Sequence, residues 1–304
     1  MLINQLVLMQ QESLYINDGE HQLHLRHIVK KPHGIPVLML HGTMENGKIF
    51  YTESGRGLGC YLAEHGFDVY VADFRGKGLS KPPIAEDAEH GQWEMINHDI
   101  PLFIDFIKAR TKQPMHIVCH SWGGVLLKAF LARNPDRVED IARLVFFGTK
   151  RVIHQTHFKK KLKIDWFWRW LAPKLAKHKR YIDLVKLKAG SDNETFLFLQ
   201  QSIPWLNESI WQDSHDNFNY HDANKEVNWP ASWHLTGIND SLLGHPEDVK
   251  HFIAESNPQA KFSVLSVKAG NLVDYDHINI LTHKLAVKDH FPKVLSWLNK
   301  FKNE

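Results

Sequence analysis

Short apolar runs alternate with longer helical patterns through the first half of the chain. The runs predicted as strands are Gln22–Val29, Pro36–Leu40, Asp68–Ala72, His116–Cys119 and Ala142–Phe147. The stretches predicted as helices are Gly57–His65, Asn97–Arg110 and Trp122–Arg133. Continuous apolar strands separated by helices are typical of a parallel sheet covered on both faces. The chain is therefore predicted to be an α/β protein.

The alternation stops after the fifth strand and resumes near residue 231. Residues 151–230 contain no clear strand. Beyond them the pattern predicts strands at Ser232–Gly237 and Lys261–Val267, a helix near Pro246–Glu255, and a last amphipathic helix over Asp289–Phe301 with Asp289 as N-cap. We therefore predict a core made of residues 1–150 and 231–304, with a helical insertion over residues 151–230 between its two parts.

The composition is that of a globular protein. Hydrophobic residues make up 43% of the 304 residues and charged residues 23%, which argues against disorder. With only Cys60 and Cys119, a disulfide framework is excluded; two buried reduced thiols are expected, and a single disulfide between them is the alternative. The N-terminus lacks a basic region before its short apolar stretch, and no run is apolar enough to span a bilayer. These features predict a cytoplasmic protein.

The segment His116–Gly124 carries the strongest chemical signal. A strand ends, Ser121 stands at the turn, and a helix begins with Gly123 and Gly124. This order matches the G-x-S-x-G nucleophile elbow, in which a strained turn points the serine hydroxyl out of the sheet. Residues two before and two after the serine must be small, which Gly123 satisfies, whereas Cys119 replaces the first glycine. The alternative is a helix N-cap serine with no chemical role.

A serine nucleophile needs a base and an orienting acid at the same edge of the sheet. The chain holds 21 histidines, and His277 is selected because it follows the last predicted strand. His283 and His290 are expected at the surface, and His120 is expected to be structural. Asp240 follows the strand Ser232–Gly237, so it is the predicted acid. Its rivals, Asp274 and Asp276, share the loop of His277.

Backbone N–H groups must also stabilise the oxyanion that forms when a serine attacks a carbonyl carbon. Trp122, directly after the serine, is the first predicted donor. The second comes from the turn after Pro36–Leu40, where Gly42 permits a tight bend. Thr43 is the predicted donor in this turn, with Met44 as the alternative.

These motifs together resemble the α/β-hydrolase superfamily, on its esterase and lipase side. The segments that carry the resemblance are HGTMENGKIF, GFDVYVADFRGKGLS, CHSWGG, TGIND and YDHINIL, which span the whole core. The resemblance implies an α/β-hydrolase fold: a mostly parallel central sheet flanked by helices, with residues 151–230 as a helical cap. It also implies a serine hydrolase with Ser121, Asp240 and His277 as catalytic triad. No metal and no cofactor is expected.

The insertion is both basic and aromatic. Between Lys150 and Lys188 stand 13 Lys or Arg residues against 2 Asp, and Lys159–Lys163 is followed by Trp166, Trp168 and Trp170. A solvated basic face is one interpretation; peripheral contact with lipid and attraction of an anionic substrate such as an acyl-CoA are two others. No nucleic-acid-binding module is recognised. Residues expected to line an acyl pocket are Leu175, Ile182, Val185 and Phe196–Leu199.

The expected substrate is a small-molecule carboxylic ester with an apolar acyl or alkyl group. An acyl-CoA thioesterase or acyltransferase would use the same three residues. An aminopeptidase would need a glutamate of the insertion to bind an amino group, and Glu194, Glu208 and Glu226 are the candidates. A non-catalytic ligand-binding protein is the remaining alternative.

Overall fold

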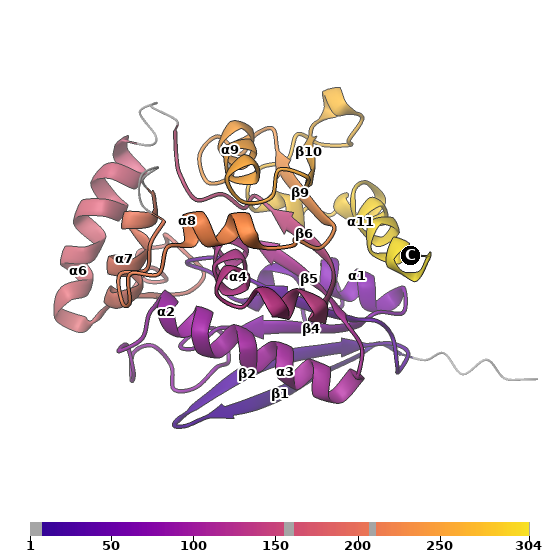
Figure 1. Ribbon diagram of the computed structural model, residues 1–304, viewed down its shortest axis with the longest axis horizontal. Coiled ribbons are helices and arrows are strands. Elements are labelled where there is room, and N and C mark those ends of the chain that lie inside the picture. The colour runs from indigo at the N-terminus through magenta and orange to yellow at the C-terminus, as the bar shows by residue number, and fades with distance from the viewer. Residues whose placement is uncertain (1–7, 155–160, 207–210, 304) are drawn as a thin grey trace, which may run out of the picture.

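A mostly parallel sheet of eight strands forms the centre of the molecule (Figure 1). The computed structural model describes residues 8–154, 161–206 and 211–303. The strand order is β1-β2-β4-β3-β5-β6-β9-β10. β2 pairs antiparallel with β1 and with β4, and all other neighbouring strands pair parallel. The bounds are β1 Gln10–Asp18, β2 His21–Val29, β3 Pro36–Leu40, β4 Asp68–Asp73, β5 Met115–His120, β6 Ile141–Phe147, β9 Ser232–Gly237 and β10 Lys261–Leu265. The predicted fold class is confirmed.

Helices cover both faces of this sheet. The core helices are α1 Leu58–Glu64, α2 Gln92–Glu94, α3 Ile100–Thr111, α4 Trp122–Arg133, α9 Pro246–Ser256, α10 Asn279–Thr282 and α11 Phe291–Asn299. Side chains of a strand point alternately to its two faces. Leu38 and Leu40 of β3 accordingly pack into a cluster with α3 and α4, while Val37 and Met39 pack into a second cluster with α1 and α11. This double burial explains why the strands are continuously apolar.

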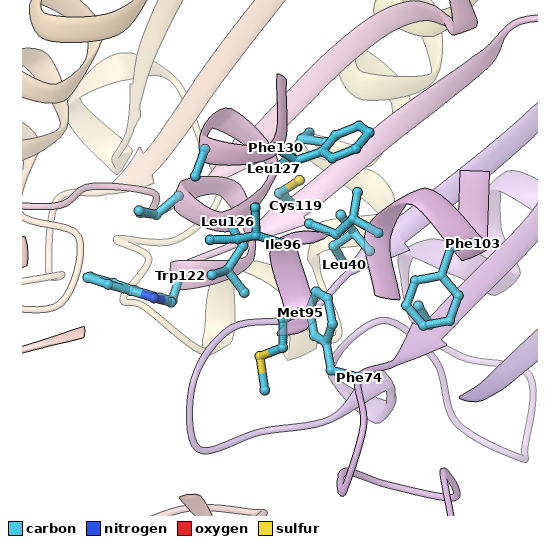
Figure 2. Packing of buried hydrophobic residues seen from close by; sticks show 14 of the residues in the cluster. Leu40, Phe74, Met95, Ile96, Phe103, Cys119, Trp122, Leu126, Leu127 and Phe130 are labelled. Carbon is cyan, nitrogen blue, oxygen red and sulfur yellow. The ribbon is translucent and has the colours of Figure 1, made fainter. Parts of the chain in front are cut away.

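The first cluster continues beneath the turn that carries Ser121. Figure 2 shows Cys119 of β5 pointing toward Leu127 and Phe130 of α4, with Trp122 at the start of the same helix. Cys119 is fully buried, and Cys60 is buried as well; both are unpaired, as predicted. The larger side chain at the first small position of the elbow is therefore accommodated by the core.

Residues 151–230 lie between β6 and β9 and are called the insertion below. Its helices are a π-helix over Lys161–Leu171, α6 Ala172–Lys179, α7 Phe196–Ser202 and α8 Tyr220–Ala223. In Figure 1, α6 and α7 lie at one end of the sheet, whereas α8 lies beside α4. A two-stranded ribbon, which the sequence did not predict, pairs β7 Tyr181–Ile182 with β8 Glu194–Thr195. Such short strands carry too few residues to show an alternating pattern.

Two further expectations differ from the structure. β1 was not predicted, although it pairs with β2 along its whole length. Asp289 is not the N-cap of the last helix, because α11 begins at Phe291 and its cap is His290. The Asp289 carboxylate instead accepts hydrogen bonds from the Leu272 N–H and the Tyr275 hydroxyl. Among the described residues, no helix is long and apolar enough to cross a membrane.

Lys128 of α4 is a fully buried cation whose replacement is expected to stabilise the fold. Its Nζ lies 4.7–5.3 Å from the ring centres of Phe146, Trp229 and Phe252 and donates to the Ser256 hydroxyl at 2.6 Å. Burial lowers the pKa of Lys128 to about 7. Replacing a buried charge with an apolar side chain of similar length removes its desolvation cost. Lys128→Met is expected to raise the free energy of unfolding at pH 6 by about 1–3 kcal/mol.

The gain from Lys128→Met depends on pH in a defined direction. Below pH 7 the lysine is protonated in both states, so the wild type carries the full cost of the buried charge. Between pH 7 and pH 10 Lys128 loses its proton in the folded protein but keeps it in the unfolded chain, so the wild type becomes more stable as the pH rises. The extra stability of Lys128→Met over the wild type therefore becomes smaller. Urea unfolding at pH 6 and pH 10 measures this. The exposed Lys250→Met is the control; equal gains at both pH values would contradict the expectation.

Candidate active site

Ser121 stands at the sharp turn between β5 and α4. Its φ of 49° and ψ of −123° lie in a strained region for a residue with a side chain. The turn is held by a hydrogen bond from the Ser121 N–H to the Phe147 carbonyl of β6, at 2.8 Å. A Cβ added at Gly123 would stand 2.3 Å from the His41 carbonyl oxygen, so this position requires glycine. The local geometry is therefore that of a nucleophile elbow.

The structure brings Ser121, His277 and Asp240 together at the carboxyl edge of the sheet. The Ser121 hydroxyl lies 2.9 Å from Nε2 of His277, and Nδ1 of His277 lies 2.5 Å from Oδ2 of Asp240. His277 is 8% exposed and Asp240 3% exposed. With the proton on Nδ1, the imidazole donates to Asp240 and accepts from Ser121. An arrangement of this kind can supply a serine with a base and the base with an orienting carboxylate.

The surroundings of Asp240 keep it ionised. Burial alone would raise the pKa of this carboxyl, but the neighbouring His277, the Gly244 N–H and the charge of Lys150 outweigh burial and hold the pKa below its ordinary value. A carboxylate in this position can stabilise an imidazolium formed on the neighbouring histidine.

The other residues considered as acid or base make different contacts. Asp274 accepts the Val267 N–H, and Asp276 accepts the backbone N–H groups of its own turn. His283 is half-buried. The expectation that His290 lies at the surface is wrong: its side chain is fully buried, Nε2 donates to the Ile280 carbonyl at 2.7 Å, and burial lowers its pKa to about 4. The sequence around a histidine does not show whether its side chain will be buried or exposed in the folded protein.

The turn after β3 lies against Ser121. A Cβ added at Gly42 would stand 2.7 Å from Cβ of Ser121, which explains the glycine. The Met44 N–H is occupied, because it donates to Glu194 Oε1 at 2.6 Å. No such bond from the Thr43 N–H is found among the described residues. Of the two predicted donors in this turn, Thr43 is therefore the one whose N–H is available.

Glu45 and His120 form a buried pair. The sequence analysis expected a structural role for His120 but did not identify Glu45 as its partner. Oε1 of Glu45 lies 2.5 Å from Nδ1 of His120 and 2.5 Å from the Gly42 nitrogen. Nε2 of His120 donates to the His277 carbonyl at 2.9 Å. Burial opposes charge on both groups, but their mutual attraction raises the pKa of His120 and lowers that of Glu45. The pair thus connects the turn after β3 to the backbone of His277, and His120 has the structural placement that was expected.

Two cavities meet at Ser121. One, of about 590 Å³, is mostly apolar; its lining includes Trp122, Ile153, Phe167, Trp168, Phe198, Leu206 and Leu243. The other, of about 910 Å³, is the more polar of the two and is called the polar cavity below, although Met44, Ile49 and Leu79 also line it; its polar lining includes Asn46, Lys48, Asp73, Lys188, Ser191 and His277. Of the residues expected in an acyl pocket, Phe198 lines the apolar cavity. Leu175 and Val185 do not, since they are 46% and 51% exposed on the outside of the insertion.

Neither of the two described glutamates considered for binding an amino group, Glu194 and Glu226, offers such a site. Glu194 is 1% exposed and forms an ion pair with Lys77 at 2.8 Å. Glu226 is exposed in a short turn after α8, and Glu208 lies outside the described residues. The same part of the chain contains no group of three or more His, Cys, Asp or Glu residues arranged to hold a metal ion.

Solved structures with this architecture show that the fold is the α/β-hydrolase fold. A soluble variant of monoglyceride lipase from Saccharomyces cerevisiae matches with a TM-score of 0.68, covering 98% of this chain and 97% of that chain at 17% identity. Haloalkane dehalogenase DbeA from Bradyrhizobium elkani matches with a TM-score of 0.65, covering 97% and 99% at 15% identity. At such identities the likeness shows the fold alone.

The family follows from the sequence match. The model of the family described as serine aminopeptidase, S33, matches residues 30–209, more than half of the chain, and the chain belongs to this family. Triacylglycerol lipase 1 of Arabidopsis thaliana is 30% identical over 107 residues, which make up 33% of this chain and 27% of that lipase. The chain thus matches between a quarter and a third of the length of its curated relatives.

Proposed function

We propose that the protein is a serine hydrolase that cleaves carboxylic esters with an apolar acyl or alkyl group. The observation that carries the proposal is the hydrogen-bonded series Ser121–His277–Asp240, which lies where an apolar and a polar cavity meet. The apolar cavity suits the hydrocarbon part of an ester, and the polar cavity suits its more polar part.

In the proposed mechanism, His277 accepts the proton of Ser121 as the hydroxyl oxygen attacks the ester carbonyl carbon. Asp240 stabilises the resulting imidazolium, and the N–H groups of Thr43 and Trp122 bind the oxyanion. His277 then gives its proton to the departing alcohol, leaving an acyl group on Ser121. Water, deprotonated by the same histidine, attacks the acyl carbon. The bond from that carbon to Ser121 Oγ then breaks, His277 returns the proton to Ser121, and the acid is released.

We propose further that the insertion acts as a cap over this site. Its residues Phe167, Trp168, Phe198 and Leu206 form much of the wall of the apolar cavity. A hydrolase built in this way takes its acyl-chain preference from the insertion, while the chemistry stays with the core.

The size of the apolar cavity predicts a chain-length preference. For p-nitrophenyl esters, kcat/KM is expected to rise up to about fourfold for each added methylene until the cavity is filled, because each buried CH₂ contributes about 0.8 kcal/mol. Phe198→Ala enlarges the cavity and is expected to move the optimum to longer acyl chains. Leu199→Ala is the matched control, since Leu199 is buried in the same helix but does not line the cavity. A flat profile, or the same shift in both variants, would contradict the assignment.

Acyl-CoA thioester hydrolysis is a second candidate. Lys48 and Lys188 line the polar cavity beside Ser121, and both are exposed cations. Attraction of a phosphate-bearing leaving group by these lysines would weaken with salt. If thioesters are the substrates, kcat/KM for an acyl-CoA will exceed that for the matching p-nitrophenyl ester and will fall as salt increases. An added alcohol acceptor in the same assay separates acyl transfer from hydrolysis.

The exposed aromatic face of the insertion supports a proposal of peripheral lipid contact. Trp166 and Trp170 are 50% and 51% exposed and stacked, with Lys174 Nζ 3.5 Å from the ring centre of Trp170. Trp166 also lines the apolar cavity. The basic run Lys159–Lys163 has side chains outside the described part of the structure. Aromatic side chains beside cations are typical of surfaces that contact anionic lipid.

This lipid contact has a direct test. Trp166→Ala/Trp170→Ala is expected to weaken sedimentation with vesicles of anionic phospholipid roughly tenfold, because it removes two large apolar side chains from the interface. Leu272→Ala, at a 53% exposed residue outside the insertion, is the control. Unchanged binding of the double variant, or absence of wild-type binding, would contradict the proposal.

A further inference from the structure

Glu194 of the insertion contacts the turn that follows β3. Its Oε1 accepts the Thr43 hydroxyl at 2.9 Å and the Met44 N–H at 2.6 Å. The same oxygen lies 2.8 Å from Nζ of Lys77, which belongs to the loop after β4. Glu194 and Lys77 are 1% and 2% exposed. One buried carboxylate thus joins the insertion to two loops of the core that lie next to Ser121.

Neighbouring residues of the insertion bind the same turn. The N–H groups of Ser191 and Asp192 donate to the Met44 carbonyl at 2.8 and 3.0 Å. The Asp192 carboxylate accepts the Asn46 side-chain amide at 3.1 Å. Residues 191–194 therefore hold both the N–H and the carbonyl group of Met44.

Met44 has a backbone conformation that requires such support. Its φ of 61° lies in the left-handed region, which is unfavourable for a residue with a side chain by about 1 kcal/mol or more. In this conformation the Met44 N–H donates to Glu194, and Met44 directly follows Thr43. The Thr43 N–H therefore belongs to a strained turn whose next residue is held by hydrogen bonds from the insertion.

We infer that Glu194 is a positioning residue, which holds the Thr43–Met44 turn so that the Thr43 N–H faces the oxyanion. The inference rests on the proposed function, since it assigns a role in oxyanion binding. A buried ion pair adds little net stability compared with an apolar replacement, whereas loss of one partner leaves the other charge buried and uncompensated. Turnover then requires the insertion to be seated on the core through Glu194.

Four variants test this role. Glu194→Ala removes the acceptor; Lys77→Met/Glu194→Gln removes both charges but keeps an oxygen acceptor for Thr43 and Met44. Thr43→Val removes the hydroxyl that donates to Glu194 and leaves the Thr43 backbone N–H in place. Glu89→Ala is the matched control, because Glu89 joins the insertion to the core through Arg180 without touching the turn.

Glu194→Ala is expected to lower kcat roughly 10- to 100-fold with KM within about threefold of wild type, because an oxyanion interaction acts in the transition state. The Ki of a trifluoromethyl ketone, whose adduct mimics the tetrahedral intermediate, should rise by a similar factor. Lys77→Met/Glu194→Gln should recover kcat to within about tenfold of wild type, and Glu89→Ala should match wild type. Thermal unfolding of each variant shows that the protein assayed is folded.

The inference is overturned if folded Glu194→Ala has the kcat of Glu89→Ala, or if it raises KM and leaves kcat and Ki unchanged. If Glu194→Ala does not fold, Thr43→Val decides: a drop in kcat of about threefold or more at constant KM supports the inference, and an unchanged kcat overturns it. A wild-type protein that hydrolyses no ester and binds no ketone would instead overturn the proposed function and the inference together.

Discussion

Replacement of Ser121 by alanine is expected to lower kcat for a preferred ester roughly 10⁴- to 10⁶-fold. Without the hydroxyl, His277 and Asp240 have no nucleophile to activate, and only binding and the oxyanion-stabilising groups remain. Because Ser121 lies in the elbow turn and contributes little to substrate contact, binding of a non-hydrolysable ether analogue should change by less than about threefold. Steady-state kinetics and calorimetric titration measure the two quantities.

The Ser121→Ala result also separates the enzyme from the binding-protein alternative. Ser54→Ala, at an exposed serine, is the control and should retain wild-type kcat. If Ser121→Ala keeps more than about a tenth of the wild-type turnover, another residue is the nucleophile. If the wild type shows ligand binding without turnover, the non-catalytic interpretation is correct.

Asp240→Asn has the second largest expected effect, a fall in kcat of about 10⁴-fold with little change in KM. The amide keeps the shape of the side chain but provides no negative charge for the imidazolium. It also favours the tautomer of His277 with the proton on Nε2, which cannot accept the proton of Ser121. The measurement is kcat and KM at several pH values for the purified variant.

The control for this variant is Asp274→Asn, on the loop that also carries His277. Asp274 accepts a backbone N–H and does not contact the imidazole, so kcat should stay within a few-fold of wild type. A large loss in Asp274→Asn together with a small loss in Asp240→Asn would show that Asp274, and not Asp240, is the acid of the triad.

The core strands and the three site residues were predictable because each has a local signal. Strands buried on both faces are continuously apolar, and the carboxyl ends of parallel strands meet at one edge. Ser121 directly follows such a strand, Asp240 lies in the turn just after another, and His277 follows the last one after a loop. Chain order and strand position were therefore sufficient to bring these three residues together.

Other features have no local signal. β1 has only Leu14, Tyr15 and Ile16 as apolar residues, too few to show an alternating pattern, and its pairing with β2 depends on contacts made only in the folded sheet. Asp289 precedes an amphipathic helix, as an N-cap would, but competing donors in the loop before His277 bind its carboxylate. Local patterns do not show which of two available partners a polar side chain takes.

The contacts of the insertion are the least predictable part of the site. Glu194 is 150 residues from Met44 along the chain, and nothing near either residue indicates the other. The sequence did identify Glu194 as one of three candidate glutamates, for recognition of an amino group. Its burial against Lys77 was not predictable, because an ion pair between distant segments forms only when the insertion packs on the core.

The central claim, an activated nucleophile at Ser121, is tested most directly by covalent labelling. The protein is treated with a fluorophosphonate at about pH 6 to 9, where a histidine base can lose its proton. The intact mass is measured and the labelled peptide is mapped, with Ser121→Ala treated in parallel. We expect one adduct per chain, on Ser121, and none in the variant. No adduct in the wild type, or an adduct that persists in Ser121→Ala, would contradict the claim.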